Sequence, residues 1–148
     1  MTRQPPTKPT PKISMLRYET DQRGFVRSRC QLSKPMKVTT AEASGPIFSS
    51  PNAIHDNRRG PITNVPLMSS NDKKFTAGLF KAGAGDIPFD SYPEDEFCYF
   101  LSGSVKLTSA DGSIVELKAG DVVVIPKGWK GRWTTTGYSK YYVVYDTK

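Results

Sequence analysis

The feature that most constrains the fold is a series of short β-prone runs in residues 75–145, each closed by a Gly, Asp-Gly or Pro turn signal. Asp111-Gly112 stands between two such runs and is a strong hairpin signal. Because no helical periodicity competes, these residues predict an all-β sandwich or barrel. The predicted strands are Phe75–Phe80, Glu96–Leu101, Ser104–Ser109, Ile114–Leu117, Val122–Ile125, Lys130–Thr135 and Tyr141–Tyr145, with a Gly-rich turn at Ala82–Gly85.

The N-terminal half has a different composition. Nine of the twelve prolines precede Phe75, and they interrupt any helix longer than two turns. We predict a disordered basic arm over residues 1–12. Residues 13–74 are predicted to form N-terminal strands and a proline-rich segment that wraps the barrel, and residues 75–148 the barrel itself.

The positive charge lies in the same half. Residues 1–74 hold 13 basic and 5 acidic side chains, whereas residues 75–148 hold 8 and 9. A basic flank can bind nucleic acid or anionic membrane, but it matches no known nucleic-acid module and lacks interleaved aromatic residues. We therefore do not expect a nucleic-acid partner. With no apolar leader, no run long enough to span a bilayer and only two cysteines, we expect a cytoplasmic protein.

The spacing of the turn residues narrows the choice among all-β folds. Glu96 is followed after six residues by Gly103, and Gly120 after five by Pro126. These are the spacings of the two cupin motifs. Residues 92–103, 120–133 and 140–143 resemble small single-domain cupins related to ureidoglycine aminohydrolase and to ethanolamine-utilisation cupins, over about residues 75–145. The resemblance implies a single cupin jelly-roll barrel and a homodimer, which in such cupins often forms by exchange of N-terminal strands.

The resemblance also implies a metal held by two His and one Glu of the first motif and one His of the second. A divalent metal needs three or four converging ligands, and this chain has one histidine, His55, far from both motifs. We predict no tight metal site and no cofactor, and the aminohydrolase activity is not carried over. Besides Glu96, the matching positions hold Phe89 and Ser91, or Asp90 and Tyr92 with a shorter loop, and Gly131.

The alternation of strand side chains predicts the barrel interior. If Glu96 points inward, Cys98 and Phe100 share its face, while Phe97 and Tyr99 face outward. The resulting slot would hold a small polar molecule. The predicted binding residues are Glu96, Tyr92, Cys98, Phe100 and Trp133, with Asp90, Arg132 and Lys140 around them.

Glu96 has two alternative roles. A carboxyl group in an apolar slot can act as a general acid or base near neutral pH, because burial disfavours its charged form. Alternatively, Lys140 or Arg132 neutralises it as part of barrel packing. Cys98 has no histidine to activate it and is predicted to be a small buried apolar residue.

Residues outside the motifs supply further candidates. If the proline-rich segment folds over the barrel mouth, His55 becomes an acid or base there, with Arg58 and Arg59 to hold an anionic substrate. The alternative is an exposed loop histidine. Glu94 and Asp95 are predicted to lie on an exposed loop without a role.

Three functions remain open from the sequence. The first is a metal-independent cupin that catalyses acid–base isomerisation, dehydration or another elimination on a small polar metabolite, with Glu96 as main residue and His55 or Tyr92 as partner. The second is a non-catalytic module that binds a small ligand or a protein. The third is a metal-dependent, aminohydrolase-like enzyme with atypical ligands. A second titratable group converging with Glu96 would favour catalysis, whereas a barrel filled by Phe, Trp and Val would favour binding.

Overall fold

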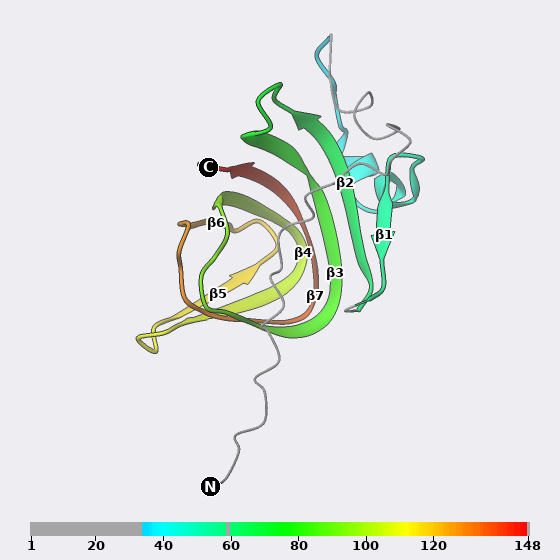
Figure 1. The fold of residues 1–148 in the computed structure, drawn as a ribbon. Helices are drawn as coiled ribbons and strands as arrows, with labels where there is room; N and C mark the ends of the chain where they lie inside the picture. The colour runs from blue at the N-terminus through cyan, green and yellow to red at the C-terminus, as the bar shows by residue number, and fades with distance from the viewer. Residues whose placement is uncertain (1–33, 59, 148) are drawn as a thin grey trace, which may run out of the picture.

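The computed structural model describes residues 34–58 and 60–147, and this part of the chain is almost entirely antiparallel β-sheet (Figure 1). The strand order is β1-β2-β3-β7-β4-β5, and β6 pairs with β4. The predicted all-β fold is confirmed. The elements are α1 (Thr40–Ala43), the 3-10 helix η1 (Pro46–Ser49), β1 (Ile54–Asp56), β2 (Ile62–Ser69), β3 (Phe75–Phe89), β4 (Asp95–Ser109), β5 (Ile114–Lys118), β6 (Val122–Ile125) and β7 (Gly131–Tyr145).

Three long bent strands build the barrel. β3, β4 and β7 have 15 residues each, and β7 pairs with both of the others along almost its whole length. The first half of β4 pairs with β6 and its second half with β5. Because different neighbours flank the two halves, the sheet folds back on itself, and Figure 1 shows these strands curving through a U.

Glycine bends these strands without ending them, which corrects the strand boundaries expected from the sequence. Residues 96–101 and 104–109 are one strand, as are residues 131–135 and 141–145. The predicted turn Ala82–Gly85 lies inside β3. β4 continues through its bend because register shifts between Phe100 and Ser102 and between Ser104 and Val105 absorb the curvature.

Gly103 is required at this bend for two separate reasons. Its φ of +77° lies in the left-handed region that favours glycine. A Cβ atom there would also overlap the carbonyl oxygen of Gly137 on the neighbouring strand. The close approach of two backbones therefore excludes a side chain at the corner of the barrel.

Two apolar clusters stabilise the fold. The larger one fills the space between the two halves of the folded sheet: Tyr92, Cys98, Phe100, Val105, Leu107, Leu117, Ile125 and Trp133. The smaller one lies on the outer face, where Ala43 and Phe48 of the helical segment pack on Val65 and Leu79. A capping box between Thr39 and Glu42 holds α1 in place. The predicted basic arm (residues 1–12) lies outside the described residues.

No helix within residues 34–58 or 60–147 is long and apolar enough to cross a membrane. The segment before β3 adds β1 and β2 to the edge of the sheet, with β2 paired to β3. It therefore extends the sheet sideways, and this placement decides which of its residues can reach the barrel interior.

We expect Gly103→Ala to lower the free energy of unfolding by roughly 2–5 kcal/mol, because left-handed strain and a backbone overlap add together. Gly120→Ala is the matched control: it has φ +93° and no atom within 4 Å of the added Cβ, so it should cost only about 1–2 kcal/mol. Urea unfolding followed by circular dichroism measures both. Equal losses of unfolding free energy in the two variants would show that the close approach of the Gly137 carbonyl to position 103 adds no cost.

Candidate functional site in the barrel interior

A buried ion pair lies at the centre of the barrel. Glu96 on β4 and Lys140 on β7 are each 1% exposed, and Lys140 Nζ lies 2.7 Å from Glu96 Oε1. Lys140 Nζ also donates to Cys98 Sγ at 3.3 Å. The register that pairs Phe100 with Lys140 sends the lysine side chain inward between the strands. Of the two neutralising residues proposed from the sequence, Lys140 is therefore the partner.

The second carboxylate oxygen of Glu96 has its own donor. The Tyr92 hydroxyl donates to Glu96 Oε2. Two backbone hydrogen bonds fix Tyr92: its N–H donates to the Trp129 carbonyl at 2.7 Å, and its carbonyl accepts from Gly128 at 2.8 Å. Both oxygens of the buried carboxylate are therefore hydrogen-bonded, as a buried charge requires.

Aromatic rings surround the lysine ammonium. Lys140 Nζ lies 4.9 Å from the ring centre of Trp133, 5.7 Å from that of Phe80 and 5.9 Å from that of Tyr138. These distances are within the range of cation–π attraction. Together with Glu96, the rings compensate for the water that the ammonium has lost.

The surroundings hold three of these groups in unreactive forms at neutral pH. Burial lowers the pKa of Lys140, but the Glu96 carboxylate, together with smaller contributions from Cys98 and Tyr138, more than offsets this, so the pKa lies well above its usual range and the group stays an ammonium. Burial raises the pKa of the Cys98 thiol to about 12, against the opposing effect of Lys140. Burial, and then the charge of Glu96, raise the pKa of Tyr92. None of the three is poised as a nucleophile or base.

The residues present do not fit the metal centre that the resemblance implies. Lys140 places an ammonium cation on Glu96, the one member of the implied ligand set that this chain keeps, and on the neighbouring Cys98. At Gly131, the second-motif position, a Cβ atom would overlap the Trp129 ring and the Thr108 carbonyl. Within residues 34–58 and 60–147, no three His, Cys, Asp or Glu side chains come together to hold a metal.

Three aromatic rings, those of Phe89, Tyr92 and Trp129, pack against one another beside Glu96. Phe89, one of the first-motif positions, lies 4.9 Å from Tyr92 and 6.1 Å from Trp129 between ring centres. Trp129 Nε1 donates to Ser109 Oγ at 3.0 Å, which fixes the indole over Gly131. At Phe89 and Gly131, two of the positions where the implied metal centre has histidine, aromatic rings are therefore packed instead.

Most of the predicted slot residues do meet. Glu96, Tyr92, Cys98, Phe100 and Trp133 are all buried in the interior, as the alternation of strand side chains predicted, while Phe97 and Tyr99 are exposed. Their contacts are with one another and with Lys140. The slot that the sequence predicted for a ligand is thus filled by the protein's own lysine.

His55 does not join this cluster, which corrects its role as catalytic partner of Glu96 and leaves the alternative of an exposed histidine. It is exposed on β1, at the sheet edge, and β2, β3 and β7 separate it from β4. Its Nδ1 lies 3.0 Å from Thr63 Oγ1. The segment pairs as strands along the edge instead of folding over the mouth. Arg58 is exposed and paired with Asp56, and Arg59 lies outside the described residues.

Three further residues differ from their predicted positions. Arg132 is exposed and donates to Asp86 at 2.6 Å, and Asp90 is exposed, so neither lines the interior. Glu94 is buried at 7% exposure instead of lying on an exposed loop. Asp95 is exposed as expected and accepts from the Lys127 N–H.

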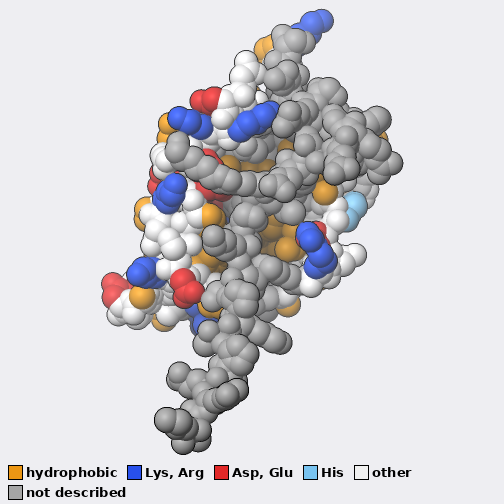
Figure 2. Space-filling view, in the orientation of Figure 1, with side chains coloured by type: hydrophobic (Ala, Val, Ile, Leu, Met, Phe, Trp, Pro, Cys, Tyr) orange, Lys and Arg blue, Asp and Glu red, His pale blue; other side chains and the backbone are white. Residues whose placement is uncertain are grey.

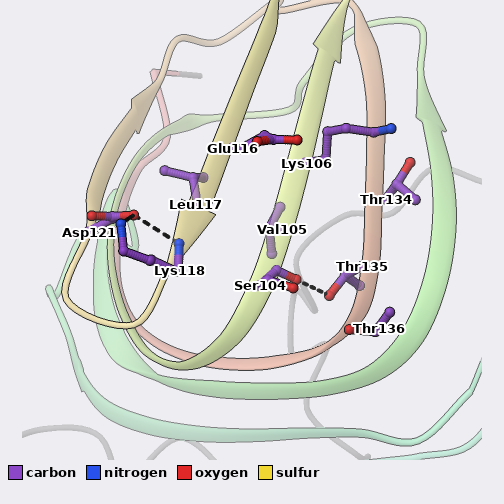
Figure 3. Close-up of a pocket in the computed structure, with 10 residues that line it drawn as sticks. All are labelled: Ser104, Val105, Lys106, Glu116, Leu117, Lys118, Asp121, Thr134, Thr135 and Thr136. Carbon is purple, nitrogen blue, oxygen red and sulfur yellow. Dashed lines mark hydrogen bonds and ion pairs between the residues drawn. The ribbon is translucent and has the colours of Figure 1, made fainter.

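An open hollow of about 640 Å³ lies at the bend of the sheet, and no motif in the sequence indicated it (Figure 3). Its lining comes from β4, β5, β7 and the turn before β6: Ser104, Val105, Lys106, Glu116, Leu117, Lys118, Asp121, Thr134, Thr135 and Thr136. Lys106 pairs in register with Glu116 and Thr134. Only that pairing of distant strands assembles the hollow.

The described surface shows no continuous basic patch in the view of Figure 2, where basic and acidic side chains are interspersed. Two ion pairs of the described chain, Arg132–Asp86 and Lys127–Asp146, join opposite charges. The positive excess of the sequence therefore lies mainly in residues before this part of the chain.

Comparison with known proteins identifies a family. Residues 69–142, half of the chain, match the model of the EutQ-like cupin domain. No curated protein sequence matches the chain.

Solved structures share the fold. A putative ethanolamine utilization protein Q from Salmonella typhimurium is 25% identical with a TM-score of 0.52, and the match covers 62% of this chain and 74% of that one. The Clostridium difficile EutQ protein is 17% identical with a TM-score of 0.52, and the match covers 76% of this chain and 82% of that one. A Rhizobium leguminosarum protein of unknown function is 23% identical with a TM-score of 0.54, and the match covers 76% of this chain and 98% of that one.

The ion pair can be tested by a double-mutant cycle. Lys140→Met and Glu96→Leu should each lower the free energy of unfolding by about 3–5 kcal/mol, because each leaves a buried charge without its partner. The double variant should lose only about 1–3 kcal/mol, mainly because the Tyr92 hydroxyl loses its acceptor. Urea unfolding at pH 7 measures all three.

The exposed pair of Arg132 and Asp86 supplies the matched control. The same cycle with Arg132→Met and Asp86→Leu should give losses and a coupling below about 1 kcal/mol. Additive losses in the interior cycle would contradict a coupled pair.

Proposed function

This chain belongs to the EutQ-like cupin family, and we propose that it works as a metal-independent, non-catalytic binding module. The observation that carries this proposal is the position of the Lys140 ammonium. It fills the centre of the barrel and contacts both Glu96 and Cys98. The interior then acts as structural packing, and binding takes place on the outside of the barrel.

The choice against acid–base catalysis rests on access. Titratable groups do converge on Glu96, since Tyr92 and Lys140 both donate to it, and this favours catalysis as the second candidate function. However, all three side chains are buried at 3% exposure or less, and they do not line the hollow at the bend. An acid or base must come within hydrogen-bond reach of its substrate.

The hollow at the bend is the proposed place for a small polar molecule. Its rim carries both charges, with Lys118 Nζ 3.8 Å from Asp121, and three consecutive threonines from Thr134 line one side (Figure 3). Val105 and Leu117 add apolar surface. Such a lining suits a ligand with hydroxyl groups and a charge.

Cys98 reports whether the interior is closed. In a Cys30→Ser background it is the only thiol of the chain, and Ala110→Cys adds an exposed reference thiol. We expect Cys98 to react with Ellman's reagent at pH 8 at least about 1000-fold more slowly than Cys at position 110, because reaction requires the thiolate and an opening of the barrel. Comparable rates would refute a closed interior.

Metal independence is tested by elemental analysis of the tag-free protein after incubation with Mn, Fe, Ni and Zn and gel filtration. We expect less than about a tenth of an equivalent of each metal, because the required three or four ligands do not converge. Close to one equivalent would revive the metal-dependent hypothesis.

A further inference from the structure

Large apolar side chains are exposed on the outside of β4, β6 and the end of β7. Their exposed fractions are high for apolar residues: Phe97 44%, Tyr99 40%, Val122 50%, Val124 67% and Tyr145 47%. We call these five residues the outer β4–β6 face. The face also carries one charge, because exposed Asp95 is in register with Tyr145.

Strand pairing makes this face continuous. Phe97 is in register with Val124, and Tyr99 with Val122. Side chains directly opposite on neighbouring strands lie about 4.5–5.5 Å apart at Cβ. At about 150–250 Å² for an aromatic side chain, the three rings leave roughly 200–330 Å² exposed at these fractions, and the two valines add to it. Patches of this size on monomers are often functional.

The same side of the sheet is covered where the described chain begins. Tyr141, the register partner of Tyr99, packs on the smaller apolar cluster under the helical segment, and so does Val38. The cover therefore extends as far as β7, and the open face begins on β4, the next strand. The first described residues of the chain thus lie at the border of the open part.

The chain outside the described part is long enough to reach across this border. Thirty-three residues precede Lys34, the first described residue, and Val38 lies four residues further on. Neighbouring strands lie about 4.8 Å apart, so β6 is about 10 Å beyond β7, and an extended chain spans about 3.3 Å per residue. Roughly ten extended residues before Val38 therefore suffice to reach β6, and the others remain to cover the face.

The composition of those residues suits an apolar surface. Among residues 1–12, only Met1 and the prolines are apolar. Residues 13–32 instead hold eight side chains that can pack on the face: Ile13, Met15, Leu16, Tyr18, Phe25, Val26, Cys30 and Leu32. The apolar part of the preceding chain is therefore concentrated in residues 13–32.

The charges are complementary as well. Asp95 accepts the Lys127 backbone N–H and has no ion pair with another side chain of residues 34–58 or 60–147. Residues 13–32 hold four arginines against two acidic residues. An arginine can pair with a carboxylate through two parallel hydrogen bonds, so this segment can supply the cation that Asp95 lacks.

We propose that residues 13–32 bind the outer β4–β6 face of their own chain and pair an arginine with Asp95. Their apolar side chains continue over β4 and β6 the cover that Val38 begins on β7. The inference goes beyond the proposed function and does not depend on it, because the face lies outside the barrel and its residues do not line the hollow. Failure of the tests on Cys98 or on metal content would leave it unchanged, and the reverse also holds.

The test is limited proteolysis of the full chain with an arginine-specific protease, followed by mass spectrometry. Residues 13–32 contain four cleavage sites: Arg17, Arg23, Arg27 and Arg29. Arg3 lies outside the segment and is the reference site in the same molecule. In wild type we expect cleavage after Arg17 and Arg23 to be at least about tenfold slower than after Arg3, because the protease cleaves only those molecules in which the segment has left the face.

The double variant Phe97→Lys/Val124→Lys should speed cleavage after Arg17 and Arg23 at least about tenfold, because it removes apolar contact and places two cations opposite the arginines. Cleavage after Arg3 should keep its wild-type rate. Ile114→Lys is the matched control, because Ile114 is 58% exposed on β5, outside the face, and it should keep the wild-type rates at all sites. Circular dichroism and thermal unfolding check that the variants fold.

Two results for the segment would overturn the proposal. One is wild-type cleavage after Arg17 and Arg23 as fast as after Arg3. The other is the same slow cleavage in wild type and in folded Phe97→Lys/Val124→Lys protein. Protection that grows between about 1 and 100 μM protein would also overturn it, because concentration dependence would assign the face to a second copy of the chain.

Discussion

The barrel depends on one buried ion pair, between Glu96 and Lys140. Taking two charges out of water costs several kcal/mol per ion, and the cost is recovered only when geometry is good and the remaining hydrogen-bonding positions are filled. Here the Tyr92 hydroxyl donates to Glu96, and Lys140 donates to Cys98. The Trp133 ring lies beside the ammonium and adds cation–π attraction. The pair also fixes how β4 and β7 align, because a slip of one residue would turn one of the two charges to the opposite face.

This pair gives one physical reason for several departures from the metal-binding pattern. A metal centre needs anionic or neutral ligands around a cation, and Lys140 supplies the cation from the protein itself. No histidine is then needed at position 131, and the freed space is taken by the Trp129 ring, so that only glycine fits there. The Lys140 ammonium beside Glu96 and the Trp129 ring over Gly131 thus belong to one arrangement of the interior.

The sequence predicted the fold well because turns and alternation are local properties. The spacing from Glu96 to Gly103 identified the family, and the period of two placed Glu96 and Phe97 on opposite faces. Long-range pairing was not visible. Glycines that bend a strand look the same as glycines that end one. The two places left open for His55 could not be decided, because nothing local shows that β1 pairs along the sheet edge. Lys140 could not be told from Arg132 as the partner of Glu96, because the direction of its side chain depends on the register shifts between β4 and β7.

The first half of β4 inverts the usual distribution of side chains, with a carboxylate inside and aromatic rings outside. Phe97 and Tyr99 are 44% and 40% exposed. At about 150–250 Å² per aromatic side chain this is roughly 130–210 Å², which corresponds to about 3–5 kcal/mol of unused burial at about 25 cal/mol per Å². Slipping the strand by one residue would bury Phe97 and Tyr99 but would break the contact of Glu96 with Lys140. The ion pair therefore holds the rings outward, and the chain forgoes the burial that the slipped register would give them.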